Sequence, residues 1–183
     1  MTKRPFAVLS GSAVGIALAL TFINSDRGSQ QTSIQHWQGS AVAGSTDADF
    51  LTRARVARQA LLALNETQTV YFSTMRDSDG ALLDGECEYR MQGEGLPARW
   101  WSITAYGEDY FLIPNKGDQY SVTMQEHGDG PWQVTIAADG QASLMAPTSG
   151  GFNLLLRLYN PNFDVFSDLE KLRLPVIEKI WCA

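Results

Sequence analysis

Paired carboxylates and histidines are the first places where this sequence could carry chemistry. Glu86 and Glu88 stand two residues apart, so both carboxylates would face the same side of a β-strand. Two carboxylates can serve as acid and base in glycoside hydrolysis, but Arg90 shares this face and favours a solvated charge pair. His36 and His127 are the only histidines, and neither has a metal-ligating companion at useful spacing. The sequence therefore indicates no catalytic residue, no metal site and no cofactor, and a non-enzymatic module is favoured.

Aromatic and arginine side chains on two predicted strands are better candidates for a binding surface. In the strand 98–106, Trp100 and Tyr106 share one face and Trp101 lies on the other, because successive side chains alternate. In the strand 150–159, Arg157 and Tyr159 lie opposite the leucine-rich core face. This composition is typical of a ligand or partner surface and suits a stacked sugar or a bound carboxylate. Alternation does not decide which tryptophan fills the core, and the N-terminal helix of the same chain is an alternative cover for this surface.

Two cysteines, Cys87 and Cys182, leave two interpretations open. The alternation around Cys87 puts it on an apolar face, where a free thiol behaves as a small hydrophobic side chain. In an oxidising compartment the two residues could instead form a disulfide that ties the C-terminal strand to the rest of the domain.

The elements that must position these residues are mostly strands. One amphipathic helix is predicted over residues 46–64, because Asp47 and Asp49 follow a capping serine and apolar residues recur at helical spacing. Breaks rich in Gly and Asp recur about every ten residues and predict a mainly β fold, an antiparallel jelly-roll-like β-sandwich. The predicted strands are 69–75, 86–92, 98–106, 109–114, 119–124, 132–137, 150–159 and 173–181, with a short helical turn at 163–169.

The N-terminal segment differs from the rest of the chain. Residues 6–23 carry no charge and would span ~27 Å as a helix, just adequate for a bilayer core of ~30 Å. Lys3 and Arg4 precede this run, which places the N-terminus in the cytoplasm and the remainder in the periplasm. We expect an uncleaved transmembrane helix, with a cleaved signal peptide as the alternative. The expected layout is a cytoplasmic end (1–5), an inner-membrane anchor (6–23), a linker (24–45) and a helix-plus-β domain (46–183).

Composition restricts the class of partner. The 183 residues include 14 Lys and Arg against 20 Asp and Glu, which gives a formal net charge of −6. Phosphate contacts need clustered basic residues, and no such stripe is present, so nucleic-acid binding is excluded.

Two longer runs identify a family resemblance. LPARWWSITAYGEDYFLIPNKGDQYSV and GGFNLLLRLYNP resemble the bacterial family catalogued as domain of unknown function 1214, whose short forms share the layout predicted above. The resemblance implies a jelly-roll-like sandwich and no agreed reaction. It also implies a partner, a small membrane protein that carries the companion domain of unknown function 1254. Two hypotheses follow: a non-enzymatic envelope protein that docks this companion, or a saccharide- or small-acid-binding protein or hydrolase that uses the aromatic and arginine surface.

Overall fold

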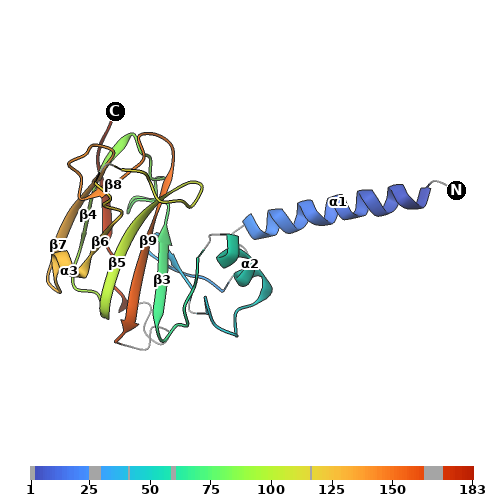
Figure 1. Ribbon diagram of the computed structural model, residues 1–183, viewed down its shortest axis with the longest axis horizontal. Coiled ribbons are helices and arrows are strands. Elements are labelled where there is room, and N and C mark those ends of the chain that lie inside the picture. The colour runs from blue at the N-terminus through green and yellow to red at the C-terminus, as the bar shows by residue number, and fades with distance from the viewer. Residues whose placement is uncertain (1–2, 25–29, 41, 59–60, 116, 163–170) are drawn as a thin grey trace.

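The computed structural model describes residues 3–24, 30–40, 42–58, 61–115, 117–162 and 171–183 (Figure 1). The prediction of a mainly β protein is confirmed, because two sheets make up most of the described domain. In chain order the elements are α1 (Lys3–Asn24), β1 (Thr32–Ile34), β2 (Trp37–Gly39), α2 (Phe50–Arg58), β3 (Thr69–Thr74), β4 (Cys87–Gly93), β5 (Ala98–Gly107), β6 (Ser121–Thr123), α3 (Met124–His127), β7 (Trp132–Ala137), β8 (Leu144–Met145), β9 (Phe152–Pro161) and β10 (Val176–Cys182).

The two sheets differ in size and pack face to face. The large sheet has the order β1-β2-β3-β9-β5-β6, and the small sheet has the order β10-β4-β7-β8. Between the strands that the structure describes, every pairing is antiparallel except that of β7 with β8, which is parallel. Ring contacts join the layers: Tyr89 of β4 meets Phe152 of β9 with centroids 5.9 Å apart. The jelly-roll connectivity expected from the sequence stays a prediction.

Burial fixes the register of the central strand β9. Its inward residues Phe152, Leu154, Leu156 and Leu158 are all fully buried between the sheets. A shift of one residue would turn all four into solvent, because side chains alternate across a strand. The long ladders to β3 and β5 therefore hold β9 with its remaining side chains facing outward.

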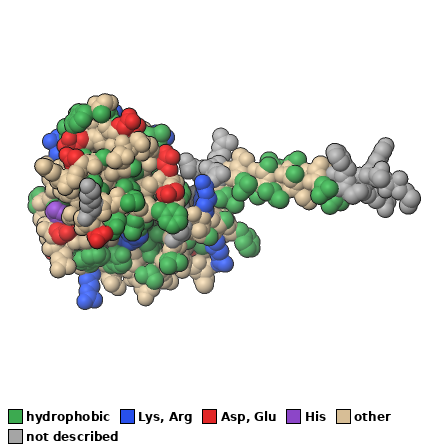
Figure 2. Space-filling model, turned by 45° about the horizontal axis from the view of Figure 1, so that its top comes forward, with side chains coloured by type: hydrophobic (Ala, Val, Ile, Leu, Met, Phe, Trp, Pro, Cys, Tyr) green, Lys and Arg blue, Asp and Glu red, His purple; other side chains and the backbone are tan. Residues whose placement is uncertain are grey.

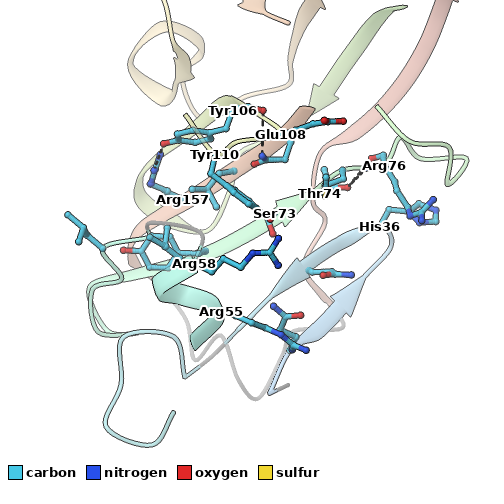
Figure 3. A pocket seen from close by; sticks show the side chains of 18 of the residues that line it. His36, Arg55, Arg58, Ser73, Thr74, Arg76, Tyr106, Glu108, Tyr110 and Arg157 are labelled. Atoms are coloured by element: carbon cyan, nitrogen blue, oxygen red, sulfur yellow. Dashed lines mark hydrogen bonds between the residues drawn. The ribbon is translucent and has the colours of Figure 1, made fainter. Parts of the chain in front are cut away.

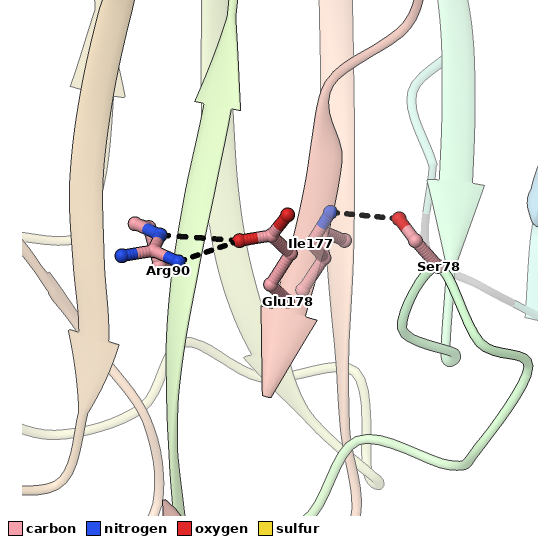
Figure 4. A network of polar contacts seen from close by, with 4 residues as sticks. All are labelled: Ser78, Arg90, Ile177 and Glu178. Atoms are coloured by element: carbon pink, nitrogen blue, oxygen red, sulfur yellow. Dashed lines mark hydrogen bonds and ion pairs between the residues drawn. The ribbon is translucent and has the colours of Figure 1, made fainter. Parts of the chain in front are cut away.

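A disulfide and several polar contacts fasten the C-terminal strand. Cys87 and Cys182 lie opposite each other on β4 and β10 and are joined by a disulfide. The sequence left open whether these cysteines are free thiols or form a disulfide, and the structure contains the disulfide. Arg90 forms an ion pair with Glu178 at 2.7 Å, and the backbone N–H of Ile177 donates to Ser78 Oγ at 2.9 Å (Figure 4). The strand is thus tied to its sheet and to a neighbouring turn.

The predicted helix 46–64 is too long, and its predicted buried stripe is wrong. Helix α2 begins after Asp49, whose carboxylate accepts a hydrogen bond from the Thr52 backbone N–H at 2.7 Å. Thr52 and Arg55 are the buried residues of α2, whereas Phe50 is 91% exposed. Arg55 turns inward because its guanidinium donates to the carbonyl oxygens of Phe22 and Ile23, at the end of α1. These polar contacts override the apolar periodicity.

The predicted linker 24–45 also needs correction. It contains β1 and β2, and β2 pairs with β3, so both strands belong to the large sheet. Trp37 explains this position, because its ring is buried and its Nε1 donates to the carbonyl of Pro175 at 2.9 Å. The prediction of a strand over 109–114 is likewise wrong, because Tyr110 adopts a left-handed conformation there. The turn predicted at 163–169 lies outside the described residues.

Helix α1 projects away from the two sheets (Figure 1). Over the described part of the chain, no helix has both the length and the apolar character needed to cross a membrane, so the anchor expected over 6–23 gains no support here. Large apolar side chains of α1 are nevertheless exposed along its length, and Figure 2 shows green hydrophobic atoms along this helix. They are Val8, Leu9, Val14, Ile16, Leu18, Leu20 and Phe22.

Candidate binding cavity on the outer face of the large sheet

A cavity of about 860 Å³ lies on the face of the large sheet that points away from the core. Its floor comes from β2, β3, β5 and β9, and its walls come from α2, the segment 61–64 and the loops at the end of β3 and β5 (Figure 3). Strand pairing explains the floor. Tyr71 of β3 lies opposite Arg157 of β9, and Asn153 of β9 lies opposite Tyr106 of β5. Because the inward residues of β9 are all apolar, its outward residues carry the polar groups into this cavity.

Arg157 is held in a fixed orientation at one end of the cavity. Its Nη1 donates to Thr104 Oγ1 at 3.1 Å, and its Nη2 donates to the Tyr106 hydroxyl at 2.7 Å. The guanidinium carbon also lies 5.8 Å from the centre of the Tyr106 ring. A guanidinium has five N–H donors, and two groups engage only part of this set. Arg157 is therefore oriented in advance for an acceptor that enters the cavity.

Basic residues dominate the charge of the cavity wall. Among the described residues, four arginines and His36 line it, against a single glutamate, Glu108. Arg157 lies at one end and Arg76 with His36 at the other, with Arg58 between them in the view (Figure 3). The whole chain carries a net charge of −6, so this concentration of positive charge opposes the trend of the protein. A concave site lined by one sign of charge focuses its potential and attracts ions of the opposite sign.

Tyr110 lines the cavity in an unusual backbone conformation. Its φ of 63° lies in the left-handed region, which is uncommon for a bulky aromatic residue. Two bonds hold the turn: the Tyr110 N–H donates to the Gly107 carbonyl, and the Gly107 N–H donates to the Phe111 carbonyl, both at 3.0 Å. Non-glycine residues in such conformations are concentrated at functional sites, where surrounding contacts enforce them. The turn presents the aromatic ring of Tyr110 to the cavity.

Several apolar side chains that line the cavity are exposed to solvent. Leu62 is 93% exposed and Leu82 is 62% exposed, although both line the cavity. Leu64 and Met75 are exposed to a lesser degree, and Ile23 adds the last turn of α1. These exposed apolar side chains, called the apolar entrance below, share the cavity with arginines of which Arg55 is buried, Arg157 is partly buried, and Arg58 and Arg76 are themselves exposed.

The predicted surface residues separate into two groups. Tyr106, Arg157 and Tyr159 line the cavity, and Trp100 packs on Tyr159 with ring centroids 5.1 Å apart. Trp101 does not belong to this surface, because it is fully buried on the core side, where its ring stacks on that of Trp132. The structure thus resolves which of the adjacent tryptophans fills the core.

Sequence reasoning missed several cavity residues. No pattern in the sequence singled out Arg55 or Arg58, and His36 fell in the predicted linker 24–45. Tyr71 alternates correctly on its strand and could have been found from that signal. Glu88 and His127, the other residues considered for chemistry, do not line this cavity.

Glu88 accepts a hydrogen bond from Trp181 Nε1 at 2.8 Å, and His127 lies against the rings of Trp101 and Trp132. Among the described residues no group of three His, Cys, Asp or Glu side chains could hold a metal ion. Among the described residues, Glu88 and His127 are therefore engaged in packing and hydrogen bonding and do not form part of a metal site.

The fold and the cavity define a two-sheet β protein with a cationic site on the outer face of its large sheet. The chain belongs to the family described as "Protein of unknown function (DUF1214)", whose model matches residues 68–163. The resemblance seen in the sequence is thereby confirmed. A comparison with curated proteins finds no match.

Two solved structures are similar to this chain. The VPA0106 protein from Vibrio parahaemolyticus is 20% identical and superposes with a TM-score of 0.61 over 99% of this chain. This chain spans 46% of that protein, about half its length. An uncharacterised protein from Burkholderia cenocepacia is 18% identical and superposes with a TM-score of 0.39. The match covers 63% of this chain and 30% of the Burkholderia chain. The Vibrio structure supports the fold alone.

Proposed function

We propose that this protein binds a small organic acid in the cavity above the large sheet. The observation that carries the proposal is the cluster of four arginines around a cavity of about 860 Å³ in an acidic protein. Cavities of roughly 300–1,000 Å³ are typical of small-molecule sites. Of the two ligands suggested by the sequence, a saccharide and a small acid, this charge favours the acid.

Arg157 is the residue that we propose to bind the carboxylate. Arginine offers parallel N–H donors that match the two oxygens of a carboxylate, and such charge-assisted bonds are roughly twice as strong as neutral ones. The bonds to Thr104 and Tyr106 restrict the side chain before a ligand arrives, so less conformational entropy is lost on binding. The tyrosines that line the cavity, Tyr71, Tyr110 and Tyr159 among them, provide rings against which the organic part can pack.

A calorimetric titration of the full chain with a panel of carboxylic acids tests this proposal. Arg157→Gln should weaken binding by roughly 10- to 150-fold, because a hydrogen bond to a charged group contributes about 1.5–3 kcal/mol. Arg90→Gln is the matched control, since Arg90 lies on the small sheet and pairs with Glu178 at the surface. Equal affinity of the Arg157→Gln variant and the unaltered protein would refute the assignment of Arg157.

The second candidate function is docking of a companion membrane protein that carries domain of unknown function 1254. The observation that favours it is the row of large apolar side chains exposed along α1, which a partner in the membrane could cover. Co-purification in mild detergent after joint expression tests this, with a complex of fixed stoichiometry as the expected result. A protein that stays monomeric beside the companion would contradict it.

We also propose that the protein sits at the inner membrane, with its β domain in the periplasm and α1 in contact with lipid. The exposed apolar side chains of α1 and the Cys87–Cys182 disulfide support this placement, because disulfides persist in oxidising compartments. Protease digestion of spheroplasts should remove the domain if it is periplasmic, and protection would count against the periplasmic placement.

We further propose that the two sheets have jelly-roll connectivity. The order β3-β9-β5 supports this, because strands far apart in sequence are neighbours in the large sheet.

A further inference from the structure

We infer that the acid bound in this cavity is a single-chain amphiphile: a long-chain carboxylate whose head lies among the arginines and whose alkyl chain covers the apolar mouth. The inference rests on the proposed function and specifies the class of acid. It concerns the residues at the entrance, which a small polar acid would leave unused.

The apolar entrance is the first observation. Leu62 and Leu82 are 93% and 62% exposed, and both line the cavity. A short, polar acid bound deep inside would leave both in water, whereas an alkyl chain would remove apolar surface from water on both sides. Because affinity then depends on buried methylene groups, it should rise by about fourfold for each CH₂ that the entrance covers.

The distribution of charge is the second observation. Arg157 and Tyr106 lie at one end of the cavity, and Arg76 and His36 lie at the other (Figure 3). The Leu64 backbone N–H donates to the Tyr71 hydroxyl at 2.9 Å, which holds the leucine-bearing segment 61–64 next to the strand residue opposite Arg157. A cationic group and an apolar wall are therefore adjacent, and this is the arrangement that an amphiphilic acid matches.

The position of α1 is the third observation. Ile23 in its last turn lines the cavity, and Arg55 fixes this turn by donating to the carbonyls of Phe22 and Ile23 at 3.3 and 3.2 Å. The exposed apolar side chains of α1 thus end at a turn that contributes Ile23 to the cavity lining. Whatever apolar phase covers α1 also borders the cavity, so an amphiphile dissolved in that phase reaches the arginines without crossing water.

The test measures affinity against chain length. The full chain is placed in phosphatidylcholine nanodiscs and titrated calorimetrically with straight-chain carboxylates from butanoate to dodecanoate, with empty nanodiscs as the blank. We expect affinity to increase with each added CH₂, and 1-octanol to bind at least tenfold more weakly than octanoate. The double variant Leu62→Gln/Leu82→Gln should reduce this dependence on length while retaining butanoate binding. Both side chains are exposed, so the fold does not require them.

The control and the contrary results separate this inference from the proposed function. Phe111→Gln is the matched control, because Phe111 is 73% exposed but does not line the cavity. It should leave the length dependence unchanged. If butanoate and dodecanoate bind equally well, the amphiphile inference is overturned and acid binding stands. If no carboxylate of any length binds, both are overturned.

Discussion

Trp101→Phe is expected to destabilise the domain far less than Trp132→Phe, although both indoles are buried and stack on each other. Trp101 is fully buried and Trp132 is 5% exposed, with ring centroids 5.0 Å apart. Their N–H groups differ. Trp132 Nε1 donates to the Glu94 carbonyl at 3.0 Å, whereas Trp101 Nε1 is buried with no hydrogen-bond partner among the described residues.

The size of the difference follows from these two N–H groups. Both substitutions remove a similar amount of ring from the same part of the core, so the packing losses largely cancel in the comparison. Trp132→Phe additionally loses a hydrogen bond worth about 0.5–1.5 kcal/mol. Trp101→Phe instead removes an unsatisfied buried donor, whose desolvation costs about 1–3 kcal/mol. The two variants should therefore differ in unfolding free energy by about 1.5–4.5 kcal/mol.

Urea unfolding followed by far-UV circular dichroism is the appropriate assay, because the substitutions alter tryptophan fluorescence directly. With an unchanged m-value, the shift in midpoint converts to free energy. Equal losses in the two variants, or a larger loss for Trp101→Phe, would refute the reasoning about the orphaned N–H.

Three further predictions concern covalent and ionisable groups. The double variant Cys87→Ser/Cys182→Ser should lose about 2–4 kcal/mol of stability in urea unfolding, because a bridge across 95 residues of sequence restricts the unfolded chain. Hydrogen bonding to the Thr52 backbone N–H lowers the pKa of Asp49 below its ordinary 3.8, so this cap stabilises the folded state above that pH. Its effect is lost as pH falls through the folded-state pKa. Asp49→Ala should lower Tm at neutral pH but not in strong acid, while Asp49→Asn should preserve most of the cap. Burial raises the pKa of Tyr89 above 10.0, so the unfolded chain releases this proton first and stability falls as pH rises above 10.0. Tyr89→Phe should reduce that alkaline loss in pH-dependent urea titrations, and an unchanged alkaline profile would contradict the assignment.

Much of the β-structure was predictable because burial alternates along a strand. The prediction 132–137 matches β7, and those for β4, β5 and β9 agree to within two residues at each end. The errors fall where a single polar or aromatic contact overrides local pattern. Arg55 buries itself against the end of α1, and Trp37 draws β2 onto the large sheet through its bond to Pro175. Such contacts join residues far apart in sequence, and no local periodicity records them.

The sequence by itself determined the family, the mainly β fold, and the outward placement of Arg157 and Tyr159 opposite a leucine-rich face, because alternation depends only on neighbours along one strand. The tertiary structure alone decided that Trp101 fills the core and Trp100 does not, and that Cys87 meets Cys182. It alone also brought the arginines of α2, the β3 loop and β9 around one cavity. Each of these outcomes depends on which faces the sheets and helices present to each other, and that choice is made by the packing of the whole chain.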